Sequence, residues 1–330
     1  MATTSAPRRT PYRATGFAGG AVTSLALLVG LLAGCRASAD LPGGARAYPR
    51  LAGFPSAAYF YDGPDAPPLV SAHRGQPELD GYPENALTSL DRLARAGSFV
   101  LELDVAMSRD SALLLFHDDR LDRLTSQSGR VAERDWADLD TMRLRDRAGR
   151  LTESTIPSLA EALAVARGRA LVTLDRKRGV SYARLSRAVR EADVADQVAL
   201  ILYDEDDLRE WAGLAEVGPV SFGGDSERDL ERARETVDEL DACAGSSANR
   251  RRGPVPLLAF VGVGPPDPAV LAKAHHLGMR TIAGTFGPLD DAADDDDGAT
   301  YRRLVAEGVD VIATNRPLAA YRALAGRYYR

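Results

Sequence analysis

Cysteine is nearly absent from this sequence of 330 residues, which contains only Cys35 and Cys243. Cys35 ends a short apolar run near the N-terminus, so one thiol remains in the rest of the chain. A single thiol cannot form an internal disulfide, and we therefore expect a packed hydrophobic core to stabilise the fold. The sequence also lacks the Cys and His spacing of a zinc site.

Several other signatures are missing. The sequence has no glycine-rich phosphate loop and no Gly-x-Ser-x-Gly motif, which argues against nucleotide hydrolases and serine hydrolases that use these motifs. There are 41 basic and 47 acidic residues, a net charge of −6. Such a balance does not favour nucleic acid as a partner, because its phosphates require a basic surface.

No apolar run is long enough to cross a membrane. Val22–Ala33 has about 12 residues, whereas a spanning helix needs about 20. Three arginines precede this run (Arg8, Arg9 and Arg13), and Leu32-Ala33-Gly34-Cys35 ends it. This order is typical of an export signal, and its last four residues resemble the bacterial lipobox, whose Cys is acylated.

We therefore expect residues 1–34 to be a lipoprotein signal peptide. The lipid on Cys35 would anchor the protein to a bacterial membrane, on the periplasmic or cell-surface side. An ordinary secretory signal is the alternative, and Arg8-Arg9 leaves twin-arginine export as a weaker one. Residues 35–68, rich in Ala, Gly and Pro, are interpreted as a tether. Without residues 1–34 the chain loses three Arg and no acid, and its net charge becomes −9.

Residues 69–330 show short apolar runs that alternate with helical patterns, which predicts one α/β domain. Ser158 and Glu161, directly after Pro157, form a capping box that starts one of the helices. The order of elements favours an irregular TIM (β/α)8 barrel. Nine runs are candidate strands: 69–73, 99–105, 112–116, 170–175, 198–202, 217–222, 256–261, 279–283 and 309–313.

Nine strands are one more than such a barrel holds, and we expect either 217–222 or 256–261 to be peripheral. The link between the second and third strands is too short for a helical crossover, so the first third of the barrel should be irregular. Residues 119–156 have few apolar side chains and are interpreted as a segment inserted after the third strand. Residues 223–254 are expected to form a charged helix and an exposed loop.

Two of the four histidines, His73 and His117, end predicted strands. In an α/β barrel, the C-terminal ends of the strands face the active site. Imidazole titrates near neutral pH, so two such side chains suit general acid and general base catalysis. A structural role is the alternative for either histidine alone, but the acidic residues nearby favour catalysis.

Three acidic residues are candidate metal ligands. Glu102 and Asp104 are two positions apart on one predicted strand, so their side chains share a face. Asp175 ends the fourth strand. Converging carboxylates repel one another unless a cation lies between them, and Ca²⁺ and Mg²⁺ prefer oxygen ligands. Lys177 beside Asp175 could neutralise phosphate charge in the transition state, and Arg74 offers a fork for phosphate.

Together these motifs resemble the glycerophosphodiester phosphodiesterase family, over about residues 69 to 319. The resemblance implies an α/β barrel, one calcium or magnesium ion, and hydrolysis of glycerophosphodiesters to glycerol 3-phosphate and an alcohol. It is carried by His73-Arg74-Gly75, Pro83-Glu84-Asn85, Glu102-Leu103-Asp104, His117-Asp118, Leu121–Thr125, Ser128–Val131, Ile156–Glu161 and Gly308–Pro317.

Carried over residue by residue, the resemblance implies a role for each matching position. His73 and His117 would form the acid–base pair, with Lys177 as a third catalytic group. The metal ligands would be Glu102, Asp104 and, less directly, Asp175. Substrate binding is expected of Arg74, Glu84 and Asn85, with Glu84 also shaping the metal site. The segment 119–156 would lie over the glycerol side.

Two departures leave alternatives open. Asp175 stands where the family usually has Glu, so its shorter carboxylate must come closer to the ion or bind it through water. Residues 281–287 replace a strand end that usually contains Trp, which alters the wall for the alcohol or glycerol group. A lysophospholipase D-like activity on bulkier diesters is therefore one alternative. A lipoprotein that binds phosphodiester headgroups without catalysis is another.

Overall fold

The computed structural model describes residues 51, 54–60, 66–212, 220–224, 226–243 and 257–329. The expected signal peptide at 1–34, the anchor Cys35 and the exposed loop expected before residue 255 lie outside the described residues. No helix among those described is both long enough and apolar enough to span a membrane.

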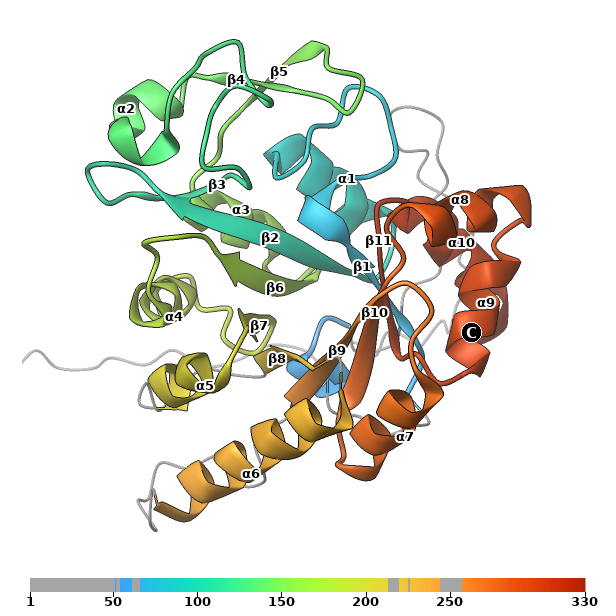
Figure 1. Ribbon diagram of the computed structural model, residues 1–330. Coiled ribbons are helices and arrows are strands. Elements are labelled where there is room, and N and C mark those ends of the chain that lie inside the picture. The colour runs from blue at the N-terminus through green and yellow to red at the C-terminus, as the bar shows by residue number, and fades with distance from the viewer. Residues whose placement is uncertain are drawn as a thin grey trace, which may run out of the picture. The chain divides into compact units, whose positions relative to one another are not determined.

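Eight parallel strands form a closed barrel (Figure 1). The barrel closes because β1 pairs with β2 on one side and with β11 on the other. This confirms the prediction of a TIM barrel. In order around the barrel, the strands are β1 (Leu69–Ala72), β2 (Phe99–Met107), β6 (Leu171–Arg176), β7 (Val198–Leu202), β8 (Val220–Gly223), β9 (Leu257–Val263), β10 (Arg280–Gly284) and β11 (Val311–Thr314).

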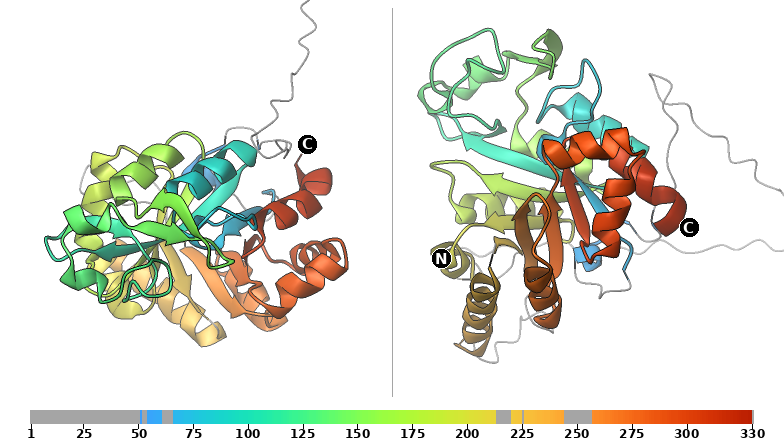
Figure 2. Two further views of the ribbon diagram at one scale, coloured as in Figure 1. Left: turned by 90° about the horizontal axis from the view of Figure 1, so that it is seen from above. Right: turned by 45° about the vertical axis from the view of Figure 1, so that its right-hand side comes forward.

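Helices lie on the outside of the strands (Figure 2). They are α1 (Leu87–Ala96), α3 (Leu159–Ala166), α4 (Tyr182–Glu191), α5 (Glu205–Ala212), α6 (Glu227–Cys243), α7 (Pro268–His276), α8 (Pro288–Asp295), α9 (Ala299–Ala306) and α10 (Pro317–Tyr328). The predicted capping box starts α3: Ser158 Oγ accepts the Glu161 N–H, and the Glu161 carboxylate accepts the Ser158 N–H. Such a cap stabilises a helix by about 1 kcal/mol.

The surplus candidate strand is β3 (Leu113–Leu115). It runs antiparallel to β2, with Val105 opposite Leu115, so a short hairpin link joins the two strands. The expectation that 217–222 or 256–261 is peripheral was wrong, because β8 and β9 pair in parallel within the barrel. Hydrophobic runs do not reveal strand direction, and the short link was the better indicator of the extra strand.

The inserted segment lies between β3 and α3. It contains η3 (Val131–Glu133), α2 (Trp136–Leu139) and an antiparallel pair, β4 (Arg143–Arg145) and β5 (Leu151–Thr155). Figure 1 shows it on the opposite side of the molecule from α6 and α7. Its apolar side chains pack against β3 in a small second core: Leu114, Phe116, Leu121, Leu124, Val131, Leu139, Leu144 and Ile156.

The packed domain extends upstream of residue 69, into the expected tether. Leu51 and Phe60 join the main core, which also contains the barrel strands and the inner faces of the helices. The buried guanidinium of Arg280 donates to the carbonyl oxygens of Tyr59 and Pro67. This part of 35–68 therefore packs against the barrel as part of the domain.

Candidate active site

The candidate site begins with a single turn of helix directly after β1. His73, Arg74 and Gly75 form the 3-10 helix η2 (His73–Gly75), and the N–H of Arg74 donates to Glu102 Oε2 at 2.7 Å. Gly75 has φ 55°, and a Cβ there would lie 2.2 Å from Leu90 Cδ2. Glycine is therefore required at this position, and the turn directs the Arg74 backbone toward a candidate metal ligand.

Glu102, Asp104 and Asp175 converge at adjacent strands. The parallel register of β2 and β6 places Asp104 beside Asp175, and Glu102 lies on the same face two residues earlier. One carboxylate oxygen from each lies within 4.8 Å of the others. Asp175 therefore reaches the cluster although it is shorter than Glu.

The charges of this cluster fit a divalent cation. Lys177 Nζ lies 2.7 Å from Asp104 Oδ1 and 2.6 Å from Asp175 Oδ2. Burial and the neighbouring Asp104 and Asp175 carboxylates raise the pKa of Glu102 well above its usual range. A bound divalent cation would favour ionisation of all three carboxylates, which with one ammonium leave two negative charges to balance its charge. The oxygen-only ligand set suits Ca²⁺ or Mg²⁺.

Two further side chains orient the carboxylates. Asn85, which is 1% exposed, donates Nδ2–H to Asp104 Oδ2 at 2.7 Å and accepts the Asp104 N–H at 3.1 Å. The Tyr203 hydroxyl, just after β7, donates to Asp175 Oδ1 at 2.5 Å. Asn85 thus holds a candidate ligand here, and its expected substrate contact stays a prediction. Tyr203 belongs to no motif, so sequence reasoning missed it.

His117 contacts one charged group on each ring nitrogen. Arg74 Nη2 lies 2.9 Å from His117 Nε2, and His117 Nδ1 lies 2.7 Å from Asp118 Oδ1. A guanidinium only donates, so Nε2 accepts and Nδ1 carries the proton that is donated to Asp118. The Nε2 lone pair therefore faces Arg74.

Arg123, from the inserted segment, extends this ionic network. It donates to Asp118 Oδ2 at 2.7 Å and to Glu84 Oε1 at 2.7 Å, and Arg74 binds the same Glu84 carboxylate at 3.1 Å. The hydrogen bond from Arg123 lowers the pKa of Asp118 to about 2. Glu84 is buried between two guanidinium groups and so holds Arg74 beside His117. Its expected contribution to substrate and metal binding stays a prediction.

His73 has neutral contacts instead. Its Nδ1 lies 2.7 Å from Oδ1 of Asn315, the residue after β11. Its ring stacks on Phe286 after β10, with ring centroids 4.2 Å apart. Burial lowers the pKa of His73, which favours the neutral ring. Phe286 lies in the 281–287 stretch where an altered wall was predicted, whereas the contact of Asn315 was not predicted.

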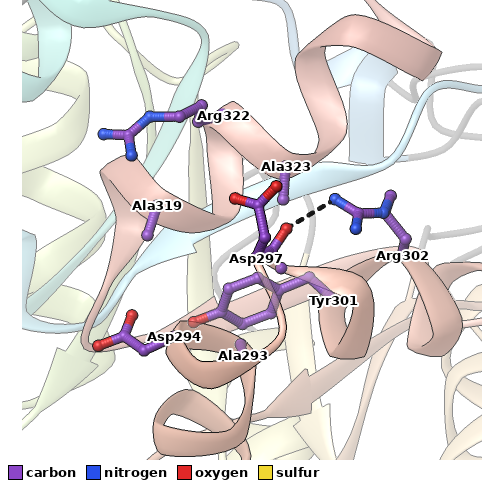
Figure 3. A pocket seen from close by; sticks show the side chains of 9 residues that line it. Ala293, Asp294, Asp297, Tyr301, Arg302, Ala319, Arg322 and Ala323 are labelled. Carbon is purple, nitrogen blue, oxygen red and sulfur yellow. Dashed lines mark hydrogen bonds between the residues drawn. The ribbon is translucent and has the colours of Figure 1, made fainter.

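A hollow on the outer helical layer is separate from this site (Figure 3). It lies among α8, α9 and α10 and shares no residue with the carboxylate and histidine cluster. Arg302 donates to the carbonyl oxygen of Asp297 beside it. The lining residues are Ala293, Asp294, Asp297, Gly298, Tyr301, Arg302, Ala319, Arg322 and Ala323.

Comparison with known proteins decides the family. The model of the Glycerophosphoryl diester phosphodiesterase family matches residues 73–319. The chain belongs to this family. A glycerophosphodiester phosphodiesterase of Caldanaerobacter subterraneus is 26% identical over 149 residues, which are 43% of this chain and 60% of that protein. The match thus spans less than two thirds of this relative's length.

Solved structures of the family share the barrel. A glycerophosphoryl diester phosphodiesterase from Parabacteroides distasonis superposes with a TM-score of 0.68 at 23% identity, covering 82% of this chain and 90% of that one. A phosphodiesterase from Oleispira antarctica, solved with the product sn-glycerol-3-phosphate, superposes with a TM-score of 0.55 at 20% identity. That match covers 78% of this chain and 96% of the other.

Proposed function

We propose that this protein is a metal-dependent phosphodiesterase that hydrolyses glycerophosphodiesters to glycerol 3-phosphate and an alcohol. The observation that carries the proposal is the convergence of three carboxylates on β2 and β6 beside two histidines. His73 follows β1, His117 follows the antiparallel β3, and Arg74 contacts both Glu102 and His117. Membership of the family supports the proposal. So does the glycerol phosphate product bound to the Oleispira antarctica protein.

Glu102, Asp104 and Asp175 would hold the ion, calcium or magnesium. When bound, such an ion polarises a phosphoryl oxygen and stabilises the negative charge of the transition state. Lys177, in contact with two of these carboxylates, adds positive charge on the same side. Arg74 offers a guanidinium fork for the remaining phosphoryl oxygens.

The two histidines divide the proton transfers. His73 is neutral, so its Nε2 accepts a proton from the attacking water while Asn315 holds Nδ1–H. A phosphate that binds Arg74 frees Nε2 of His117 to take up a proton, and Asp118 stabilises the protonated ring. His117 then donates that proton to the leaving alcohol oxygen as its bond to phosphorus breaks. One imidazole gains a proton and the other loses one.

A lysophospholipase D-like activity is a second candidate, because apolar side chains flank the site. A Cβ on Gly284 would lie 2.9 Å from the Phe286 ring and 3.1 Å from Val263 Cγ2, so these two side chains are close neighbours. Val263 is 60% exposed at the end of β9. Together they could contact an acyl chain on one half of the diester.

The test is an assay of the purified protein with calcium or magnesium on glycerophosphocholine, glycerophosphoethanolamine and lysophosphatidylcholine. Release of glycerol phosphate from the two small diesters, abolished by excess chelator, is expected. Cleavage of the lysophospholipid alone would favour the second candidate. Tight headgroup binding without turnover of any diester would indicate a non-catalytic binder, and full activity in chelator would contradict the metal role.

We also propose that the protein is exported and anchored to a membrane through lipid on Cys35. The support is the order of three arginines, an apolar run and Leu32-Ala33-Gly34-Cys35. Export would place the catalytic domain outside the cytoplasm, beside the lipids from which glycerophosphodiesters derive. Mass spectrometry of the mature N-terminus tests this, since a protein that retains residues 1–34 or has an unmodified Cys35 would contradict it.

A further inference from the structure

Asp290 is a buried carboxylate that the proposed reaction does not use. It lies in the first turn of α8 and is 2% exposed. Its Oδ1 accepts three hydroxyl groups, from Thr285 at 2.6 Å, Thr314 at 2.6 Å and Tyr301 at 3.0 Å. Its Oδ2 accepts the N–H of Asn315 at 3.0 Å. Four hydrogen bonds thus converge on this carboxylate in the first turn of α8.

The partners of Asp290 adjoin the two groups that contact His73. Thr285 precedes Phe286, whose ring stacks on the imidazole. Asn315 is itself a partner, and its side chain accepts from His73 Nδ1. One carboxylate therefore binds the loop after β10 and the loop after β11, and each loop supplies one contact to the ring.

We propose that Asp290 is a positioning residue for His73. It fixes Asn315 through the backbone N–H and fixes the loop of Phe286 through the Thr285 hydroxyl. These contacts hold the imidazole in one orientation and in the tautomer with a proton on Nδ1. The consequence for catalysis rests on the proposed function, whereas the orientation and tautomer of the ring do not.

Two substitutions of Asp290 separate its hydrogen bonds from its charge. Asp290→Leu removes every acceptor and leaves the Asn315 N–H without a partner. Asp290→Asn keeps one oxygen for that N–H, and two of the three hydroxyls can rotate to accept from its NH₂ group. The asparagine variant is therefore expected to recover most of what the leucine variant loses.

Asp310 provides a control on the same two strands, and it also contacts the basic side chains of His275 and Arg280. It lies directly before β11, at the opposite end of the barrel, and accepts the N–H and hydroxyl of Thr281 in β10 at 2.8 and 3.0 Å. Asp310→Leu therefore also removes a carboxylate that joins β10 to β11, but far from His73. Any loss common to both leucine variants reflects the strand pair, not the imidazole.

Kinetics on glycerophosphocholine give the first readout. We expect Asp290→Leu to lower kcat by about 10- to 100-fold with KM changed less than about threefold, as for a misplaced catalytic group. Asn315→Ala should cause a similar loss, and the double variant should be no worse than either single one. Two outcomes would show that Asp290 has a merely structural role. Either the two losses multiply in the double variant, or Asp310→Leu loses as much kcat as Asp290→Leu.

Nitrogen-15 NMR of the imidazoles gives a second readout that needs no substrate. The chain has four histidines, and a His73→Gln variant assigns the His73 signals. We expect a proton on Nδ1 in the wild type, Asp290→Asn and Asp310→Leu, and a mixture of tautomers in Asp290→Leu. Asp290→Ser, too short to reach Asn315, replaces the leucine variant if that does not fold. An unchanged His73 spectrum in the leucine or serine variant would overturn the proposal, even if no diester is turned over.

Discussion

The two histidines of the site lie in contrasting surroundings. His117 belongs to a charged half of the site, where carboxylates and guanidinium groups alternate: Arg74, Glu84, Asp118 and Arg123. His73 belongs to a neutral half, where an amide and an aromatic ring contact the imidazole. Burial favours the neutral ring of His73. His117 instead has Asp118 on Nδ1 and Arg74 on Nε2. We infer from these surroundings that the two like residues have opposite roles.

The largest effects should come from removing either ring. His73→Gln and His117→Gln should each lower kcat on glycerophosphocholine by about 10³-fold, within the usual range for general acid–base catalysis. A diester with a p-nitrophenyl leaving group needs no proton on that group. The His117 variant should therefore recover most of its activity on this substrate, and the His73 variant should not.

His276 offers a control for these two variants. It is exposed on α7, outside the site, so His276→Gln should have wild-type kinetics on both substrates. Equal recovery of the His73 and His117 variants on the p-nitrophenyl diester would show that the contrast in surroundings does not divide the roles. Recovery of the His73 variant alone would reverse them.

Replacing the side chain that contacts Nδ1 of each histidine should have an intermediate effect. This effect should be seen in the pH dependence of kcat/KM. A general base works only above its pKa, and burial lowers the pKa of His73 from 6.5, so the wild-type rising limb should lie below pH 6.5. Asn315→Asp places a carboxylate on Nδ1, favours the imidazolium and should move this limb to higher pH. Activity near pH 6 should then fall by about tenfold.

Asp118→Asn makes the opposite change at Nδ1 of His117, because it replaces a carboxylate by an amide. A general acid works only while it is protonated, and removal of the carboxylate disfavours the protonated ring of His117. The falling limb of kcat/KM should therefore move to lower pH, with about tenfold less activity near pH 8. If both exchanges moved the same limb, the two rings would titrate as one coupled unit and the comparison would fail.

Several members of the charged half could be proposed from the sequence. Arg74, Glu84 and His117 lie within 45 positions of one another and belong to short motifs. Strand periodicity also predicted that Glu102 and Asp104 share one face. Sequence reasoning did not predict that the Glu84 carboxylate forms ion pairs with both Arg74 and Arg123. That contact depends on how the inserted segment folds over the barrel, which local patterns do not specify.

The neutral half was largely missed, for a physical reason. His73 and Asn315 are 242 positions apart and meet only because β1 and β11 pair when the barrel closes. Thr285 and Asp290 are ordinary polar residues in sequence, and only burial reveals their common hydrogen bonds. The same limit explains the misassigned ninth strand, since hydrophobic runs predicted the strands but not the direction of β3.

The smallest expected effect concerns stability at acid pH. Asp118 has a folded-state pKa of about 2, below its ordinary value of 3.8, because of its hydrogen bond with Arg123. A depressed carboxyl pKa stabilises the fold above pH 4, and this contribution is lost as the pH falls toward 2. The Asp118 side chain is 25% exposed, so solvent screening reduces the contribution to about 1 kcal/mol.

Urea unfolding of Asp118→Asn at pH 6 and pH 3 measures this contribution directly. The variant should be less stable than the wild type by about 1 kcal/mol at pH 6, and the difference should shrink at pH 3, where the wild-type carboxylate begins to lose its advantage. Asn315→Ala is the counterpart in the neutral half. The Asn315 amide raises the pKa of His73, so its removal should cost more stability at pH 3 than at pH 6, the opposite trend. A difference for Asp118→Asn that is independent of pH would mean that Asp118 contributes packing but no charge, and that the two halves differ less in energy than in geometry.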